Sequence, residues 1–164
     1  MKTLLISLHI MTISIFSFQS QQNQAGTTTL LNSYYEVKNA LINADAETAA
    51  AKAGQFIKAS GGFDLKTLPD AKMNAFMSIQ KNLTADAERI KATKDIAKQR
   101  EYFATFSLDF YSLAKTVKLS GHPVYQQFCP MKKMYWLSSE TSIKNPYYGN
   151  AMLSCGRVTE TINP

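Results

Sequence analysis

Two cysteines, Cys129 and Cys155, are the only ones in the 164-residue chain, and both lie near its C-terminus. The same block holds three methionines, Met131, Met134 and Met152. Thiolate and thioether sulfurs are soft ligands, which select Cu(I) over hard cations such as Mg²⁺ and Ca²⁺. The residue types therefore predict either a soft-metal site or a disulfide between the two cysteines.

The spacing of four of these sulfurs suits a Cu(I) site. Cys129 and Met131 are two residues apart, so their side chains share one face if the segment is extended. Met152 and Cys155 are three residues apart, so they share one face if the segment forms a helical turn. Two such pairs facing each other would surround a metal with sulfur. We expect Cys129, Met131, Met152 and Cys155 as the metal ligands and Cu(I) as the candidate cofactor.

A disulfide between Cys129 and Cys155 is the alternative for the same residues. Paired cysteines in exported proteins commonly form disulfides. Closing a loop of about two dozen residues would stabilise the fold by roughly 3 kcal/mol in the chain-entropy model. A zinc site is less favoured, because His122 is the single histidine outside the N-terminal segment that could join the cysteines. Both interpretations of the cysteine pair remain open from the residues alone.

An aromatic segment beside the cysteines is a candidate interaction surface. Its residues are Trp136, Asn145, Tyr147 and Tyr148. Aromatic side chains are enriched at protein interfaces, which favours a contact role. The alternative is that the Asn-Pro pair begins a tight turn and the tyrosines pack onto the rest of the protein.

Combinations of residues typical of enzymes are missing from the sequence. A single histidine outside the N-terminal segment, without the glycines of a nucleophile elbow, does not make a serine-hydrolase triad. No glycine-rich phosphate-binding loop is present. Arg100 and Glu101 are expected to make ordinary pairs at the surface or at the edge of the bundle. We therefore expect no catalytic residues and a non-enzymatic protein.

The first 20 residues have the layout of a secretory signal peptide. Lys2 supplies a positive start, an apolar stretch covers residues 3–18, and small residues follow. The stretch is shorter than the ~20 apolar residues that a spanning helix needs, and polar residues interrupt it. We expect residues 1–20 to be a signal peptide, residues 21–28 a flexible lead-in, and the mature protein to be periplasmic and not integral to the membrane.

The balance of charge argues against a nucleic-acid partner. The chain has 18 Lys and Arg against 12 Asp and Glu, a net charge of +6. A basic protein can bind nucleic acid, but here the lysines are interspersed with acidic residues along the helical part. The expected export points the same way. After the signal peptide about 140 residues remain, which suits a single domain over residues 29–164.

Apolar residues recur at helical spacing in four segments between residues 29 and 117. Asp45 suits the N-cap of the second segment, Pro69 the first turn of the third, and Thr93 the cap of the fourth. Short connections between amphipathic segments predict a mainly α fold, an up-and-down four-helix bundle. Aromatic residues on the last segment are expected to fill the core of the bundle: Phe103, Phe106 and Phe110.

The pattern changes after residue 122. Short β-prone runs at residues 124–125, 135–137 and 157–159 are separated by proline, glycine and asparagine. We expect residues 122–164 to form a small irregular C-terminal lobe that carries the cysteines and methionines, includes a short β-hairpin and packs against the bundle.

Several motifs in this sequence together resemble a known family. In the C-terminal block they are Cys129-Pro130-Met131, Tyr135-Trp136-Leu137-Ser138, Asn145-Pro146-Tyr147-Tyr148-Gly149, Met152-Leu153 and Cys155-Gly156. In the helical part they are Tyr35-x-x-Lys38-x-Ala40-Leu41 and Gln99-Arg100-x-x-Phe103. The chain thereby resembles exported bacterial proteins with a domain of unknown function (DUF3347-like), found alone or fused to heavy-metal efflux adaptor proteins.

The resemblance implies a function as well as a fold. It implies handling of a soft metal in the periplasm, with heavy-metal efflux components as partners, and it implies no enzymatic activity. One departure is visible in the connection between the first cysteine motif and the Tyr-Trp-Leu motif. Relatives tend to have a longer loop containing glycine, whereas here the connection is Lys132-Lys133-Met134. It places two positive charges near the expected cation site.

Overall fold

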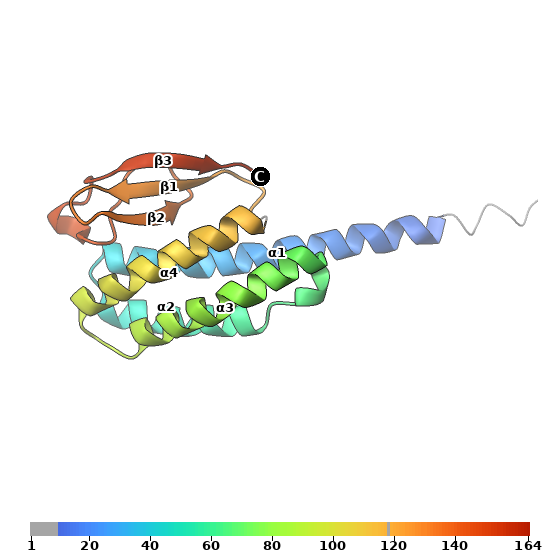
Figure 1. Ribbon diagram of the computed structural model, residues 1–164, viewed down its shortest axis with the longest axis horizontal. Coiled ribbons are helices and arrows are strands. Elements are labelled where there is room, and N and C mark those ends of the chain that lie inside the picture. Colours follow the sequence, from blue (N-terminus) through green and yellow to red (C-terminus); the bar gives the residue numbers. More distant parts are fainter. Residues whose placement is uncertain (1–9, 118) are drawn as a thin grey trace, which may run out of the picture.

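The computed structural model describes residues 10–117 and 119–164 and shows four α-helices followed by a small antiparallel sheet (Figure 1). The mainly α fold predicted from the sequence is confirmed, and the C-terminal lobe contains the β structure. The helices are α1 (Ile10–Ile42), α2 (Ala46–Gly61), α3 (Asp70–Lys91) and α4 (Ile96–Thr116). The strands are β1 (Val124–Cys129), β2 (Met134–Ser138) and β3 (Arg157–Ile162), and two short 3₁₀ helices are η1 (Leu65–Thr67) and η2 (Gly149–Ala151).

The helices run up and down, and each packs against the next along the chain (Figure 1). Their shared core is aromatic. Tyr34 of α1 is fully buried, and its ring stacks on Phe110 of α4 with the ring centroids 4.6 Å apart. Phe106 of α4 meets Phe56 of α2 edge to face at 4.7 Å. The aromatic stripe on the last helix therefore fills the core, as its spacing predicts.

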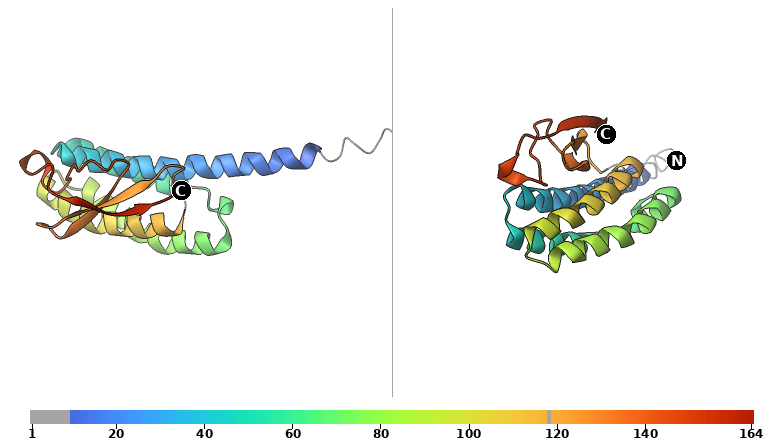
Figure 2. Two further views of the ribbon diagram at one scale, coloured as in Figure 1. Left: turned by 90° about the horizontal axis from the view of Figure 1, so that it is seen from above. Right: turned by 60° about the vertical axis from the view of Figure 1, so that its left-hand side comes forward.

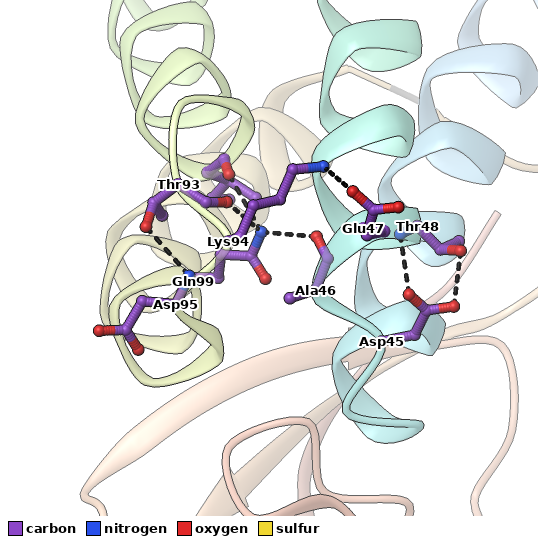
Figure 3. Close-up of polar contacts among 9 residues, drawn as sticks. Asp45, Ala46, Glu47, Thr48, Thr93, Lys94, Asp95 and Gln99 are labelled. Carbon is purple, nitrogen blue, oxygen red and sulfur yellow. Dashed lines mark hydrogen bonds and ion pairs between the residues drawn. The ribbon is translucent and has the colours of Figure 1, made fainter.

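Side-chain caps fix where two of the helices begin, and Figure 3 shows the cap of α2 together with the contact between Thr93 and Asp95. The Asp45 carboxylate accepts hydrogen bonds from the amide and the hydroxyl of Thr48, so the predicted N-cap of α2 is confirmed. Helix α4 is capped by Asp95 and not by Thr93. The Asp95 carboxylate accepts from the first amides of the helix, while the Thr93 hydroxyl accepts from the amide of Asp95 itself. A charged acceptor at the position next to the helix makes the stronger cap.

Helix α1 is continuous from Ile10, so residues 21–28 are helical where a flexible lead-in was expected. Glutamine is a good helix former, and a helix propagates easily from a segment that is already packed, as residues 30–42 are. Residues 1–9, which include the expected positive start of the signal peptide, lie outside the described residues. None of the described helices combines the length and apolar character that a membrane crossing requires.

The three strands form an antiparallel sheet in the order β2-β1-β3. The expected hairpin is present as β1 and β2, and β3 adds a third strand on the other edge of β1. Strand β3 alternates between exposed and half-buried positions, so its sequence carries a weaker signal than the buried strands. Figures 1 and 2 show the sheet covering α1 and α4, with α2 and α3 on the far side of these helices.

A buried hydroxyl joins the sheet to the bundle. The Tyr34 hydroxyl on α1 accepts a hydrogen bond from the Leu137 amide of β2 at 2.9 Å, and it lies 2.6 Å from the Ser107 hydroxyl of α4. Since the Leu137 amide donates to the Tyr34 oxygen, the hydroxyl proton of Tyr34 can be donated to the Ser107 hydroxyl. One side chain thus connects α1, α4 and β2, which holds the C-terminal lobe in one position over the bundle.

Candidate functional site

The structure brings the two cysteines together. Their Sγ atoms lie 3.9 Å apart, and both are free thiols. Cys129, the last residue of β1, is fully buried, whereas Cys155, in the loop before β3, is partly exposed. The pair therefore lies at the boundary between the core and solvent, and of the two residues Cys155 is the one accessible to solvent.

The register of the sheet accounts for this proximity. Phe128 of β1 pairs with Arg157 of β3. The two strands are antiparallel, so the residue after Phe128 lies opposite the residues that precede Arg157. Cys129 therefore faces the loop that carries Cys155. Residues 26 positions apart along the chain meet because β3 pairs with β1.

A glycine beside Cys155 permits the close approach. A Cβ atom on Gly156 would lie 2.8 Å from the Trp136 ring and 3.0 Å from the carbonyl oxygen of Phe128. Both distances are shorter than ordinary van der Waals contacts, so a side chain at this position requires its neighbours to move. The absence of a side chain lets the loop lie directly on the sheet.

The side chain of Asn145 fastens the loop that carries Cys155. Asn145 is fully buried, and its Nδ2 donates to the carbonyl of Cys155 at 2.7 Å. Its Oδ1 accepts from the amide of Tyr147 at 2.8 Å, and its own amide donates to the carbonyl of Leu153 at 2.8 Å. Because buried amides held at several points are costly to displace, this residue fixes the position of Cys155.

Three of the four residues expected to form an interaction surface are buried. Trp136 is 1% exposed, Asn145 0% and Tyr147 3%. The Tyr147 hydroxyl donates to the carbonyl of Tyr135, and its ring meets Trp136 at 6.0 Å. These three residues therefore do not form an exposed surface. The Tyr147 ring packs onto the bundle beside Phe103 of α4, with the ring centroids 5.9 Å apart, as the alternative predicts for the tyrosines. Tyr148 is half-buried, with the Lys132 ammonium 5.3 Å from its ring.

The two methionines proposed as ligands lie at the surface. Met131, in the turn between β1 and β2, is 64% exposed, and Met152, in the loop before β3, is 40% exposed. Met134 is half-buried and packs against the core. The structure thus brings together the cysteine half of the expected four-sulfur site and leaves the two thioethers exposed on the flanking segments.

Partial burial affects the acidity of the Cys155 thiol. It raises the pKa of Cys155, and the hydrogen bond and the charge of the neighbouring Cys129 raise this pKa further. The backbone amide of Met131 acts in the opposite direction. A thiol with a raised pKa stays protonated at neutral pH, so a metal must displace the proton when it binds.

Ligands other than sulfur are scarce near the pair. Among residues 10–117 and 119–164, no group of three or more His, Cys, Asp or Glu side chains lies close enough together to hold a metal. His122 is exposed in the connection between α4 and β1. The arrangement therefore offers two thiols, with sulfur or solvent to complete the coordination, which suits a soft monovalent ion better than zinc.

Arg100 has a structural role that sequence reasoning missed. Its Nε donates to the carbonyl of Pro146 at 2.9 Å and its Nη2 to the carbonyl of Leu41 at 3.0 Å. The guanidinium thus ties α4 to the end of α1 and to the loop of the C-terminal lobe. Gly149 lies against it, since a Cβ there would be 2.7 Å from Nη2. No local pattern in the sequence signals these backbone acceptors.

Comparisons with known proteins place the helical part in a family. Residues 30–122 match the family model described as "Protein of unknown function (DUF3347)", which is more than half of the chain. The matched range contains α2, α3, α4 and the C-terminal part of α1, and it ends before β1, so the cysteine pair lies beyond it. No curated protein and no solved structure matches the chain.

Proposed function

The chain belongs to the family of proteins of unknown function DUF3347, and we propose that it is a non-enzymatic protein that binds a soft metal ion, Cu(I) in the first place. Cys129 and Cys155 are the thiolate ligands. Met131 and Met152 are the thioether ligands that join from the flanking segments. The observation that carries this proposal is the 3.9 Å separation of two free thiols at the edge of the core.

The separation of the sulfurs fits a shared metal ion. With both sulfurs ~2.3 Å from a metal, as in thiolate sites, a sulfur–sulfur distance of 3.9 Å corresponds to an angle of about 116° at the metal. This angle lies between those of tetrahedral and trigonal coordination. A disulfide instead requires the sulfurs to move ~1.9 Å closer, to a bond length near 2.05 Å.

The exposure of the ligands defines an order of binding. Cys155 and the methionines are accessible from solvent, while Cys129 lies behind them. An incoming ion meets the exposed sulfurs first and displaces the Cys155 proton. It then displaces the Cys129 proton as well, and both thiolates coordinate it, with the two protons released to solvent. Release to a partner reverses these steps, as the partner's ligands replace the exposed sulfurs one at a time.

The setting of this activity is also part of the proposal. The signal-like residues 1–20 favour export, and the motifs that resemble efflux-linked proteins favour a periplasmic role with heavy-metal efflux components as partners. The missing catalytic combinations favour binding and transfer without catalysis. The metal ion is the cargo of the protein in this account.

An anaerobic Cu(I) titration tests the proposal. The reduced protein competes for Cu(I) with a colorimetric chelator, beside the Cys129→Ser/Cys155→Ser double variant and the Met131→Leu/Met152→Leu variant. We expect one ion per chain for the wild type, no competition by the cysteine variant, and weaker binding by the methionine variant. Equal competition by the wild type and the cysteine variant would refute the thiolate site.

A disulfide-stapled interaction domain that binds no metal is the second candidate. The same 3.9 Å separation favours it, because a modest rotation of either cysteine side chain brings the sulfurs toward bonding distance. Mass spectrometry of protein isolated from an oxidising compartment separates the two. A loss of about 2 Da with two blocked thiols, together with no Cu(I) binding after reduction, would establish the staple.

A further inference from the structure

A second site lies away from the cysteine pair, in a pocket between α1 and the segment that follows β2. Its volume is about 380 Å³, at the lower end of the range for small-molecule sites. Tyr35, Lys38 and Ile42 line it from α1, and Glu140 and Lys144 line it from the other side. We call it the Lys38 pocket. None of its lining residues belongs to the candidate metal site.

The side chain of Lys38 is 6% exposed, and its ammonium group reaches the pocket. Among the residues that the structure describes, the ammonium has no hydrogen bond and no ion pair, although the charge of Glu140 acts on it from a greater distance. The ammonium nitrogen lies 5.0 Å from the centroid of the Tyr35 ring. Charged groups that are shielded from water are normally paired, because a charge that loses its hydration without gaining a partner costs free energy. The residue is thus poised for an anionic partner.

The hydroxyl of Tyr35 is a second polar group without a hydrogen-bond partner. It is buried and has no hydrogen-bond partner within the described part of the chain. Buried polar atoms in native proteins nearly always have partners. The Lys38 ammonium, which reaches the pocket, therefore lacks an acceptor, and the unpaired Tyr35 hydroxyl lies buried on a residue that lines the same pocket. A ligand that brings an acceptor oxygen would satisfy the ammonium.

The charges around the pocket favour a ligand with one negative charge. Glu140 is already engaged, because its carboxylate accepts from Lys144 at 3.0 Å and from Ser142 at 2.8 Å. Lys38 and Lys144 against Glu140 leave a net charge of +1. A monoanion neutralises this charge, whereas a dianion such as phosphate would be repelled by Glu140. Ile42 and the Tyr35 ring add an apolar wall for the body of the ligand.

We propose that the Lys38 pocket binds a small organic monocarboxylate, with the carboxylate on the Lys38 ammonium and the apolar body against Tyr35 and Ile42. This site is independent of the soft-metal site. It gives the protein a second ligand of a different chemical class, and it uses the Tyr35 and Lys38 motif of the first helix, which the cysteine pair leaves without a role.

The protonation of Lys38 makes the binding depend on pH. Burial lowers the pKa of Lys38 to about 8, Glu140 acts against this shift, and Lys144 adds to it. Burial raises the pKa of Tyr35, so its hydroxyl keeps its proton over the same range. The affinity for a carboxylate should therefore be highest below pH 8 and fall at higher pH, as the ammonium loses its charge.

The test uses 4-fluorobenzoate as the probe, observed by ¹⁹F NMR with the full protein. Lys38→Met removes the charge and keeps the length of the side chain, and Lys58→Met is the control on an exposed lysine of α2. We expect saturable binding at pH 7 that weakens at least tenfold in Lys38→Met and is unchanged in Lys58→Met. Inorganic phosphate should compete poorly.

Folding of the variant is checked separately. Lys38→Met removes an unpaired charge from a largely buried side chain, so its thermal midpoint should equal or exceed that of the wild type, which separates loss of binding from loss of folding. Binding by Lys38→Met equal to that of the wild type would overturn the proposal. So would no binding to the wild type at about 10 mM probe, which corresponds to a negligible affinity.

Discussion

At the scale of single residues, the two thiols differ in what surrounds them. Cys129 belongs to the buried core and Cys155 to the loop that solvent reaches. A buried thiol behaves as a small apolar side chain, whereas an accessible one can exchange ligands. In the proposed metal site, the pair would therefore combine a fixed ligand with an accessible one, which would suit capture and release of an ion.

Gly156→Ala should disturb the site through one methyl group. The added Cβ would press on the Trp136 ring and on the Phe128 carbonyl, and overpacking of this kind typically costs about 1–3 kcal/mol. We expect lower stability in urea, changed emission of the single tryptophan, and weaker Cu(I) binding, because the shift displaces Cys155.

Gly61→Ala is the matched control. A Cβ on Gly61, at the end of α2, meets nothing within 4 Å, so its stability should be unchanged or slightly raised. If Gly156→Ala behaved like Gly61→Ala in both stability and emission, the close contact between the loop and Trp136 would be contradicted.

At the scale of elements, the loop between β2 and β3 is held by buried polar contacts as much as by apolar packing. Asn145 supports it from within, and Arg100 reaches it from α4. The position of Cys155 therefore depends on contacts contributed by elements distant in sequence. A change in these contacts should reach the thiol pair without touching either sulfur.

Asn145→Ala tests this coupling. The substitution leaves the carbonyl of Cys155 and the amide of Tyr147 without their partner, and each unsatisfied buried group costs about 1–3 kcal/mol. We expect destabilisation of roughly 2–4 kcal/mol in urea and faster labelling of Cys155 by a thiol reagent in the native protein.

The exposed Asn150 supplies the comparison, because Asn150→Ala removes the same side chain from the surface of η2. It should change stability by less than about 0.5 kcal/mol. Equal labelling rates in the wild type and Asn145→Ala would show that the loop is held by other contacts.

At the scale of the whole molecule, the stability of the fold should depend on pH through Lys38. Its pKa is lowered to about 8 in the folded protein from 10.5. Between these values the unfolded chain binds more protons than the folded one, so stability rises with pH. From pH 8 to pH 10 the wild type should gain about 2 kcal/mol relative to Lys38→Met.

Urea denaturation of both proteins at several pH values measures this difference. Burial raises the pKa values of Tyr34, Tyr35 and Tyr147. Above pH 10 these tyrosines lose their protons more readily in the unfolded chain, which lowers the free energy of unfolding as the pH rises. The comparison therefore stops at pH 10. Subtracting the free energies of unfolding of the two proteins at each pH cancels the titration of groups that both contain, such as Cys155. Parallel pH profiles would contradict the lowered pKa of Lys38 in the folded protein.

The helical half of the molecule could be predicted from local patterns, because its signals are local. The Asp45 cap and the aromatic stripe of α4 act within a few residues of where they appear in the sequence. The choice of Asp95 over Thr93 was missed because both residues can cap, and the outcome depends on which one lies next to the first turn.

The candidate site could be predicted only in part, because long-range pairing builds it. The sequence indicates that Cys129 and Cys155 belong together, but the register of β3 on β1 sets their distance. The burial of Trp136 and Asn145 depends on how the lobe packs onto α1 and α4, which no periodicity within the lobe reveals. The carbonyls that Arg100 binds are equally invisible in the sequence, since every residue has one.

X-ray absorption at the copper K-edge identifies the ligands of the bound ion, on protein loaded with one equivalent of Cu(I) and freed of excess metal. We predict a first shell made of sulfur at about 2.3 Å, absent from the Cys129→Ser/Cys155→Ser variant because that protein retains no copper. A first shell of nitrogen or oxygen, or equal copper retention by the variant, would contradict the thiolate site.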